Sequence, residues 1–384
     1  MGYGKPSNSR GGVGQIHNGA DDNASGTAAL LEVIEALSLH KDIPRRSILF
    51  VFWDAEEMGL LGSKHWIDYP SVPLDQITIY LNLDMVGRLN GKPLSLFGSR
   101  SAAGLRSCSV KCNHRETGVK IHFDNAIRPD SDHWPFYQKG IPFLMLHTGK
   151  HDDYHRPEDD AHKIDFEGAR TCAQLLAQLT LDFALQTEKP EYRNADRGVL
   201  EGIDQQARVD TSDPPRLGVA WNAEKYKQGK LLITQVLSNT AAEKADLKVG
   251  DEIVKIDGRS PVAAPGFAAL IRSAPVKINM QIKRMNTEKP LEIPVELDGE
   301  PVRLGIEWKN DESEPTVVVI SDVVKSSPAD LAQLQINDRI YEIGDKTFEN
   351  SDEFRKLATT LPLPFNVLVE REGLLKKIAI QSTR

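Results

Sequence analysis

The feature that most constrains the fold of this chain is an internal repeat in its C-terminal half. The sequence RLGVAW at 216–221 recurs as RLGIEW at 303–308, which is 87 residues further on. The same offset carries residues 238–258 onto residues 325–345. A period of this length exceeds the roughly 20 to 50 residues of solenoid repeats. We therefore expect two copies of one small α+β domain.

The N-terminal half alternates apolar runs with helical periodicity. The runs Ser47–Trp53, Ile77–Leu83 and Pro142–Leu146 are nearly continuous, as in strands that are buried on both faces. Residues 24–37 and 169–179 carry apolar residues at helical spacing and predict two amphipathic helices. Together these patterns predict an α/β fold with a mixed, largely parallel sheet flanked by helices.

The domain boundaries follow from these patterns. A chain of 384 residues is too long for one ordinary domain. Residues 188–215 are charged and aperiodic, which is typical of a linker. We expect a catalytic domain at 1–187, the linker at 188–215, and the two repeated domains at 216–299 and 300–384.

Composition excludes several classes of protein. A formal net charge of −8 argues against nucleic acid as the main partner, because phosphate binding requires a basic surface. No apolar run is long enough to span a bilayer. The three cysteines are too few for a disulfide framework and lack zinc-finger spacing. We see no signal peptide in this sequence.

Acidic residues and a histidine follow the apolar runs of the N-terminal half. Asp21 and Asp22 precede the first predicted helix, and Glu56 and Glu57 follow the run that ends at Trp53. In open α/β sheets, ligand-binding groups collect beyond the carboxyl ends of the strands. A hydrolase that uses two metal ions needs a bridging carboxylate, further ligands, and a separate carboxylate to move protons. This pattern predicts a zinc-dependent hydrolytic site.

The chain resembles the co-catalytic zinc aminopeptidases, a family that includes glutaminyl cyclases and some carboxypeptidases. The matching segments, in the family's order, are GADDNASG, the Glu56-Glu57 pair, NLDMVG, SDHWPF and YHRPEDD. The resemblance implies that Asp21 bridges two zinc ions and that Glu57 and His155 bind one of them. It implies Asp84 as a ligand of the second ion and Glu56 as the general acid/base.

The resemblance also implies a cis peptide bond between Asp21 and Asp22. Further residues of these segments are expected to line the pocket or to orient a ligand from behind, with Tyr154 as a candidate donor to the oxyanion. These supporting residues are Asp22, Ser131, Asp132, His133 and Tyr154.

The chain departs from the family pattern at its beginning. The family's remaining ligand is a histidine two residues before an aspartate, on a strand upstream of GADDNASG, and this sequence has no such pair. We interpret His17 as a loop histidine. The second zinc site therefore lacks its upstream histidine, and we expect the catalytic domain to be truncated at its N-terminus.

The repeated segments resemble the carboxylate-binding loop of PDZ domains. Backbone N–H groups around a glycine can bind the C-terminal carboxylate of a peptide while a neighbouring strand pairs with it. The second copy has Asn337 where the first has Gly250, which predicts an altered turn. The loop residues are Leu217, Gly218 and Val219 in the first copy and Leu304, Gly305 and Ile306 in the second.

These observations predict a zinc-dependent exopeptidase, an aminopeptidase, which acts on peptides or proteins and carries two PDZ-like domains. Two alternatives stay open: a catalytically impaired chain that binds C-terminal peptides, and an enzyme with single-zinc glutaminyl cyclase chemistry. We expect the full-length form to be extracytoplasmic, in the periplasm or secreted.

Overall fold

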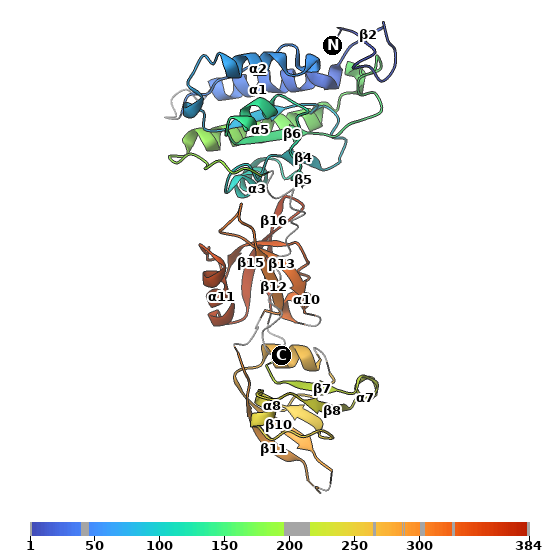
Figure 1. Cartoon of the computed structure of the whole chain (residues 1–384), viewed down its shortest axis with the longest axis vertical. Coiled ribbons are helices and arrows are strands. Elements are labelled where there is room, and N and C mark those ends of the chain that lie inside the picture. Colours follow the sequence, from blue (N-terminus) through green and yellow to red (C-terminus); the bar gives the residue numbers. More distant parts are fainter. Residues whose placement is uncertain are drawn as a thin grey trace. The chain divides into compact units, whose positions relative to one another are not determined.

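A computed structural model gives the fold of residues 2–39, 46–195, 216–263, 266–285, 287, 289–299, 304–324 and 327–381 (Figure 1). The chain forms two compact units. Unit 1 comprises Met1–Asp204, Glu312–Pro315 and Glu370–Leu375, and unit 2 comprises Gln205–Asp311, Thr316–Val369 and Lys376–Arg384. Of the linker predicted at 188–215, residues 196–215 lie outside the described residues.

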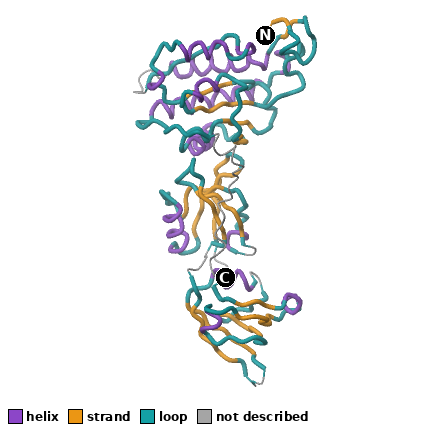
Figure 2. The backbone as a smooth tube through the Cα atoms, viewed as in Figure 1, coloured by secondary structure: helices purple, strands orange, loops and turns teal. Residues whose placement is uncertain are grey.

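A mixed sheet lies between helices in unit 1 (Figure 2). It has four strands in the order β3-β6-β4-β5. Its strands are β3 (Tyr80–Leu83), β4 (Leu94–Phe97), β5 (Ile121–Asp124) and β6 (Phe143–His147). The pairs β3–β6 and β4–β5 are parallel, and β4–β6 is antiparallel. The prediction of a mixed, largely parallel α/β sheet is confirmed.

Helices cover both faces of this sheet. Leu144 and Leu146 of β6 face a core that also contains side chains of three helices. Phe143 and Met145 face a second core, because successive side chains of a strand point to opposite faces. Both sets are buried, which explains the continuous apolar run. The helices are α1 (Gly26–Ser38), α3 (Leu105–Glu116) and α5 (Phe166–Leu185) on the first face, and α2 (Leu61–Asp68) and α4 (His133–Gln138) on the second.

Two predicted strands differ from the structure. Residues 46–53 form no regular element, and the run Ile77–Leu83 is a strand only at Tyr80–Leu83. Half-buried and exposed side chains alternate from residue 46 to residue 50, but the alternation breaks at Phe50 and Val51, and both Leu49 and Phe52 are exposed. No residue in the described part of the chain forms a β-ladder with this segment. A strand is stabilised by pairing with a neighbour, so an apolar run alone does not produce one.

Two five-stranded sheets of the same plan form unit 2, except that the turn between the last two strands, Glu370–Leu375, belongs to unit 1. The first has the order β11-β10-β9-β8-β7 and the second the order β12-β13-β14-β15-β16. The strands of the first are β7 (Val219–Trp221), β8 (Leu231–Val236), β9 (Glu252–Ile256), β10 (Lys277–Lys283) and β11 (Leu291–Glu296), and its helices are α7 (Ala223–Lys227), α8 (Ala241–Lys244) and α9 (Phe267–Ser273). The strands of the second are β12 (Ile306–Asn310), β13 (Val318–Val323), β14 (Arg339–Ile343), β15 (Phe365–Arg371) and β16 (Leu374–Ile380), with helices α10 (Pro328–Leu331) and α11 (Ser351–Thr360). Each sheet packs against its own apolar core, as expected for two copies of one α+β fold.

The glycine of each predicted loop makes the same close approach in both copies. Gly218 has φ 81° and Gly305 has φ 79°. A Cβ at Gly218 would lie 2.3 Å from the Thr240 side chain, and one at Gly305 would lie 2.2 Å from Ser327. Only glycine fits this position without strain.

The turn that contains Asn337 is not altered, contrary to the expectation from the sequence. Asn337 has φ 72° and Gly250 has φ 93°, so both adopt the left-handed region. Their amides donate to the equivalent carbonyls of Ile320 at 2.8 Å and Ile233 at 3.0 Å. Asparagine tolerates this conformation better than most residues, which explains the substitution.

Candidate metal centre

Four segments of unit 1 bring acidic and imidazole side chains together. Residues Ala20–Ser25 form a short helical turn before α1, which is interrupted at Asp22 and Asn23 by non-helical backbone angles. Glu56–Met58 is a 3-10 turn after the segment 46–53. Asp84 directly follows β3, and the loop after β6 carries His155.

Three of these side chains form one cluster. His155 Nε2 lies 3.0 Å from Asp22 Oδ2 and 3.2 Å from Glu57 Oε1. One potential ligand atom from each residue lies within 4.8 Å of the other two. Zinc binds carboxylate oxygen and imidazole nitrogen readily, and three protein ligands are typical of catalytic zinc sites. The donor set therefore fits zinc.

The electrostatics of the cluster reflect close pairing of opposite charges. Hydrogen bonding to His155 lowers the pKa of Glu57. Burial alone would lower the pKa of His155, but the hydrogen bonds to Asp22 and Glu57 outweigh it and raise this pKa to about 10. A metal ion at this place would take over the role of the imidazolium proton, because binding requires the neutral ring.

A cavity of about 330 Å³ lies beside the cluster and holds two further carboxylates. Asp22 and His155 line it together with Glu56 and Asp84. Burial, followed by the charges of Asp84 and Glu57, raises the pKa of Glu56 to about 8. Burial also raises the pKa of Asp84 to about 7, with a contribution from Asp22. Carboxylates that repel one another in this way would be stabilised by a bound cation.

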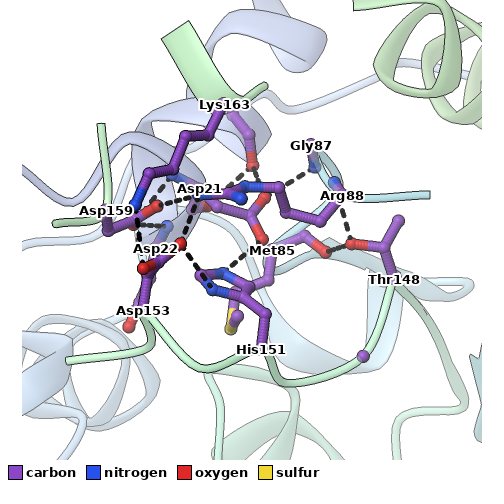
Figure 3. A network of polar contacts seen from close by, with 12 residues as sticks. Asp21, Asp22, Met85, Gly87, Arg88, Thr148, His151, Asp153, Asp159 and Lys163 are labelled. Atoms are coloured by element: carbon purple, nitrogen blue, oxygen red, sulfur yellow. Dashed lines mark hydrogen bonds and ion pairs between the residues drawn. The ribbon is translucent and has the colours of Figure 1, made fainter. Parts of the chain in front are cut away.

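The structure exchanges the positions expected for Asp21 and Asp22. Asp22 belongs to the cluster, whereas the Asp21 carboxylate accepts hydrogen bonds from Gly87 N at 2.6 Å and Ser25 Oγ at 3.0 Å and lies 3.1 Å from His151 Nε2 (Figure 3). The cis peptide bond lies between Asp22 and Asn23, and not between Asp21 and Asp22. Adjacent side chains point in different directions, so one of the pair is buried and only the other faces the cluster.

A network of charged groups holds the Asp21-Asp22 segment in place (Figure 3). Asp159 Oδ2 accepts hydrogen bonds from the amides of Asp21 at 2.9 Å and Asp22 at 3.0 Å. Arg88 lies 3.2 Å from the other oxygen of Asp159 and 3.3 Å from Asp153. The buried Asp159 carboxylate is thus paired with a cation while it orients both aspartates.

The other predicted site residues are not all at the cavity. Ser131 lines it and accepts a hydrogen bond from Asn82 Nδ2 at 2.8 Å. Tyr154 also lines it, and its ring stacks on His155 with centroids 3.8 Å apart. Asp132 instead bonds to the Ser63 hydroxyl, and His133 stacks on Phe143 in the apolar core.

His17, which we interpret from the sequence as a loop histidine, lies at the end of a short strand and beside the cluster. It ends β2 (Ile16–His17), which pairs with β1 (Gly2–Tyr3). Together with Asp22, Glu57 and His155, it lines a small second cavity of about 30 Å³. Its Nε2 lies 3.3 Å from the Ser9 hydroxyl and is outside the three-residue group.

Several residues at the site were not predicted from the sequence, among them two histidines and an aspartate. His151 and Asp159 support the aspartates, and His147 lines the main cavity, where its Nδ1 accepts a hydrogen bond from Gly149 N at 2.7 Å. His151 and Asp159 lie four residues before and after His155. This density of titratable residues in one loop is the signal that could have identified them.

Comparisons with known proteins show what each part of the chain is similar to. Peptidase family M28 matches residues 7–180, and the PDZ domain matches residues 206–283 and 302–380. Aminopeptidase YwaD of Bacillus subtilis (strain 168) is 32% identical over 184 residues, which cover 45% of this chain and 39% of that protein. Leupeptin-inactivating enzyme 1 of Streptomyces exfoliatus is 34% identical over 146 residues, which cover 38% of this chain and 32% of that protein. The chain thus spans less than half of the length of these relatives.

Among solved structures, the LapA aminopeptidase of Legionella pneumophila matches with a TM-score of 0.42 and 21% identity, over 47% of this chain and 50% of that chain. A match at this level does not bear on the function of the chain.

Proposed function

We propose that this chain, in which a peptidase family M28 domain is followed by two PDZ domains, is a zinc-dependent aminopeptidase that acts on peptides or proteins. The cluster of Asp22, Glu57 and His155 carries this proposal, because two of its members, Asp22 and His155, also line the cavity that holds Glu56. Relatives named as aminopeptidases support it.

In this proposal, the acidic and imidazole side chains at the cavity have separate tasks. Asp22, Glu57 and His155 would hold one zinc ion, and Asp84 and Asp22 could offer oxygen ligands to a second. Zinc supplies a Lewis acid that polarises a carbonyl group and acidifies water. Asp22, and not Asp21, would thus be the aspartate of the tandem that contributes a ligand.

Glu56 moves the protons of the reaction. It lines the cavity, and its neighbours and burial raise its pKa to about 8. A cation nearby would offset the neighbouring negative charges and lower that pKa, so Glu56 can take up a proton from water and return it to the leaving amine near neutral pH. Tyr154 presents its hydroxyl from the same cavity as a candidate donor to the oxyanion.

The Glu56→Gln variant tests this assignment. The amide cannot accept the proton, so we expect hydrolysis of aminoacyl-anilides to fall by about 10²-fold or more while the zinc content stays at the wild-type level. Undiminished hydrolysis in this variant would contradict the role of Glu56. Zinc measured per chain in the wild-type protein shows whether one or two ions bind.

One observation favours a second candidate function. The group that places ligand atoms within 4.8 Å of one another contains three residues, which suit a single ion. Glutaminyl cyclase chemistry needs only one such ion. Formation of pyroglutamate from glutaminyl peptides, with no release of anilide from aminoacyl substrates, would favour this function over the peptidase.

The two PDZ domains suggest a binding role in addition. We propose that the loops around Gly218 and Gly305 bind C-terminal carboxylates of peptides, with domain boundaries at 216–299 and 300–384. Equilibrium binding of a C-terminal peptide library to the Glu56→Gln chain tests this, and it also tests the alternative of a catalytically impaired peptide-binding protein.

Among the described residues, no helix is long and apolar enough to cross a membrane. An extracytoplasmic location of the protein stays a prediction, which cell fractionation can check.

A further inference from the structure

A second group of potential metal ligands lies outside the cavity, between two helices of unit 1. Cys108 and Cys112 lie on α3, and Asp182 lies on α5. We propose that these three side chains form a separate site for a thiophilic divalent cation such as zinc or cadmium. Thiolate ligands select such cations, and carboxylate oxygen completes many zinc sites.

The geometry suits a tetrahedral ion. Residues four apart on a helix project from the same face, so both sulfur atoms point towards α5. One ligand atom from each of the three residues lies within 4.8 Å of the other two, and Cys112 Sγ lies 3.3 Å from Asp182 Oδ2. Bond lengths of about 2.3 Å to sulfur and 2.0 Å to oxygen place the two atoms about 3.5 Å apart in a tetrahedral zinc site. Small movements of side chains are therefore enough to bind an ion.

Neighbouring residues orient the proposed ligands. Gln178 Nε2 donates to Asp182 Oδ1 at 2.8 Å, which leaves Oδ2 directed at the sulfur atoms. Gln186 Nε2 lies 3.9 Å from Cys108 Sγ. Second contacts of this kind fix ligand orientation in known metal sites. Water can fill the fourth position, because Cys108 is only half-buried.

A cation already occupies this place in the protein. The Arg115 guanidinium bonds to Asp182 Oδ2 and lies 3.4 Å from Cys112 Sγ. The Arg115 side chain is 49% exposed, so it can move into solvent when an ion binds. The two thiols release their protons to the solvent on binding. The divalent ion thus replaces one positive charge and is balanced by two thiolates and a carboxylate.

Sulfur ligation distinguishes this site from the candidate catalytic centre, whose ligands are oxygen and nitrogen atoms. Cadmium is added to the metal-free full-length chain, and thiolate-to-cadmium charge transfer is followed by ultraviolet absorption. We expect about one sulfur-ligated cadmium per chain in the wild type. X-ray absorption at the zinc edge is expected to show zinc–sulfur scattering at about 2.3 Å in the zinc-loaded protein.

Matched variants distinguish the proposed site from the catalytic centre and from the third cysteine. Cys108→Ser and Cys112→Ala are expected to abolish the sulfur signal. Asp182→Asn is expected to weaken cadmium binding at least about tenfold, because loss of an outer-shell contact alone weakens metal binding by about that factor. Cys172→Ala, which removes the third and fully buried cysteine, and Glu57→Gln at the catalytic centre are expected to retain it.

Cadmium is also expected to raise the melting temperature of the wild type and not that of Cys108→Ser. This comparison guards against variants that merely fold poorly. A wild-type protein without the sulfur signal, or a signal that persists in Cys108→Ser, would overturn the proposal. A disulfide between Cys108 and Cys112 that forms in place of metal binding when cadmium is added under reducing conditions would also contradict it.

Discussion

At the scale of single residues, the adjacent aspartates Asp21 and Asp22 have different surroundings. Asp21 is fully buried, and its carboxylate accepts hydrogen bonds from Gly87 N and Ser25 Oγ. Asp22 keeps part of its surface exposed and lies 3.0 Å from His155 Nε2. The first carboxylate therefore stabilises the fold around the site, and the second is free to bind an ion.

Substitution of each aspartate separates these two roles. We expect Asp22→Asn to lower zinc affinity at least tenfold and to leave the melting temperature of the zinc-free protein almost unchanged. We expect Asp21→Asn to retain zinc but to lower the free energy of unfolding by about 1–3 kcal/mol, because buried hydrogen bonds are lost. Zinc analysis and thermal unfolding of both variants measure this. The opposite assignment of effects would return the ligand role to Asp21.

A buried ion pair in unit 2 predicts a dependence of stability on pH. Arg284 Nε and Nη2 each lie 2.8 Å from one oxygen of Asp251, whose side chain is 1% exposed. Burial alone would raise the pKa of Asp251, but the hydrogen bonds from Arg284 and from the Lys248 amide outweigh it and lower this pKa. The ion pair therefore contributes its full stability above the unfolded pKa of about 3.9 and loses it as the pH falls through the lower folded pKa.

The Asp251→Asn variant isolates this effect. We expect it to destabilise β9 and β10 by about 3 kcal/mol at neutral pH, because the Arg284 charge loses its buried partner. The difference from the wild type should shrink as the pH falls through the folded pKa of Asp251. Hydrogen exchange of the β9 and β10 amides at several pH values measures it. A difference that stays constant down to acid pH would argue against the ion pair as its source.

The sequence indicates which residue types gather at the site but not which of two neighbours faces it. The tandem at 21–22 is compatible with either aspartate as the ligand. The choice depends on the backbone angles at Asp22 and Asn23, on the hydrogen bond that Gly87 N donates to Asp21, and on the one that Asp159 accepts from the Asp21 amide. These contacts are between residues far apart in the chain. Local pattern therefore predicts the chemistry of the site better than the place of each ligand.

At the scale of elements, repetition is a stronger predictor than apolar runs. The repeat at an offset of 87 residues predicts two equal folds, and both sheets have the same strand order. The run at 47–53 predicts a strand, but the described residues provide no ladder partner for it. A repeat constrains all the contacts within a fold at once, whereas a run constrains only burial.

The shared loop glycine gives a prediction for these elements. Gly218 and Gly258 have φ values of 81° and 79°. A Cβ added at Gly218 would lie 2.3–2.4 Å from side-chain atoms of Thr240, whereas one added at Gly258 would have no neighbour within 4 Å. We expect Gly258→Ala to cost about 1 kcal/mol from backbone strain alone and Gly218→Ala about 3 kcal/mol, because a steric clash is added. Urea unfolding of the full chain measures both. Equal costs would argue against the close approach.

At the scale of the whole molecule, unit 1 is assembled from three separate parts of the sequence. Its segments Glu312–Pro315 and Glu370–Leu375 lie far along the chain from residues 1–204. Glu314 accepts hydrogen bonds from the amides of Arg106 at 2.8 Å and Ser107 at 3.2 Å, at the start of α3. A carboxylate at a helix N-terminus is favourable because the first amides have no partner within the helix. The sequence does not predict this, because no local pattern links residues that are so far apart in the chain.

Two glutamates of the segment Glu370–Leu375 give a prediction for unit 1 as a whole. Glu370 is 1% exposed and pairs with Arg106, whose Nη2 lies 2.6 Å from Oε1, whereas Glu372 is 60% exposed and pairs with Lys120 at the surface. We expect Glu370→Gln to lower the free energy of unfolding of unit 1 by about 3 kcal/mol, because it leaves a largely buried cation without its charge partner.

The Glu372→Gln variant is the matched control for this prediction. Exposed ion pairs contribute between about 0 and 1 kcal/mol, so we expect this variant to unfold at nearly the wild-type temperature. Calorimetry of the full chain, with hydrogen exchange of α3 amides to identify the transition of unit 1, measures both variants. If Glu370→Gln left the exchange of α3 amides unchanged, the ion pair between Glu370 and Arg106 would contribute no stability to unit 1.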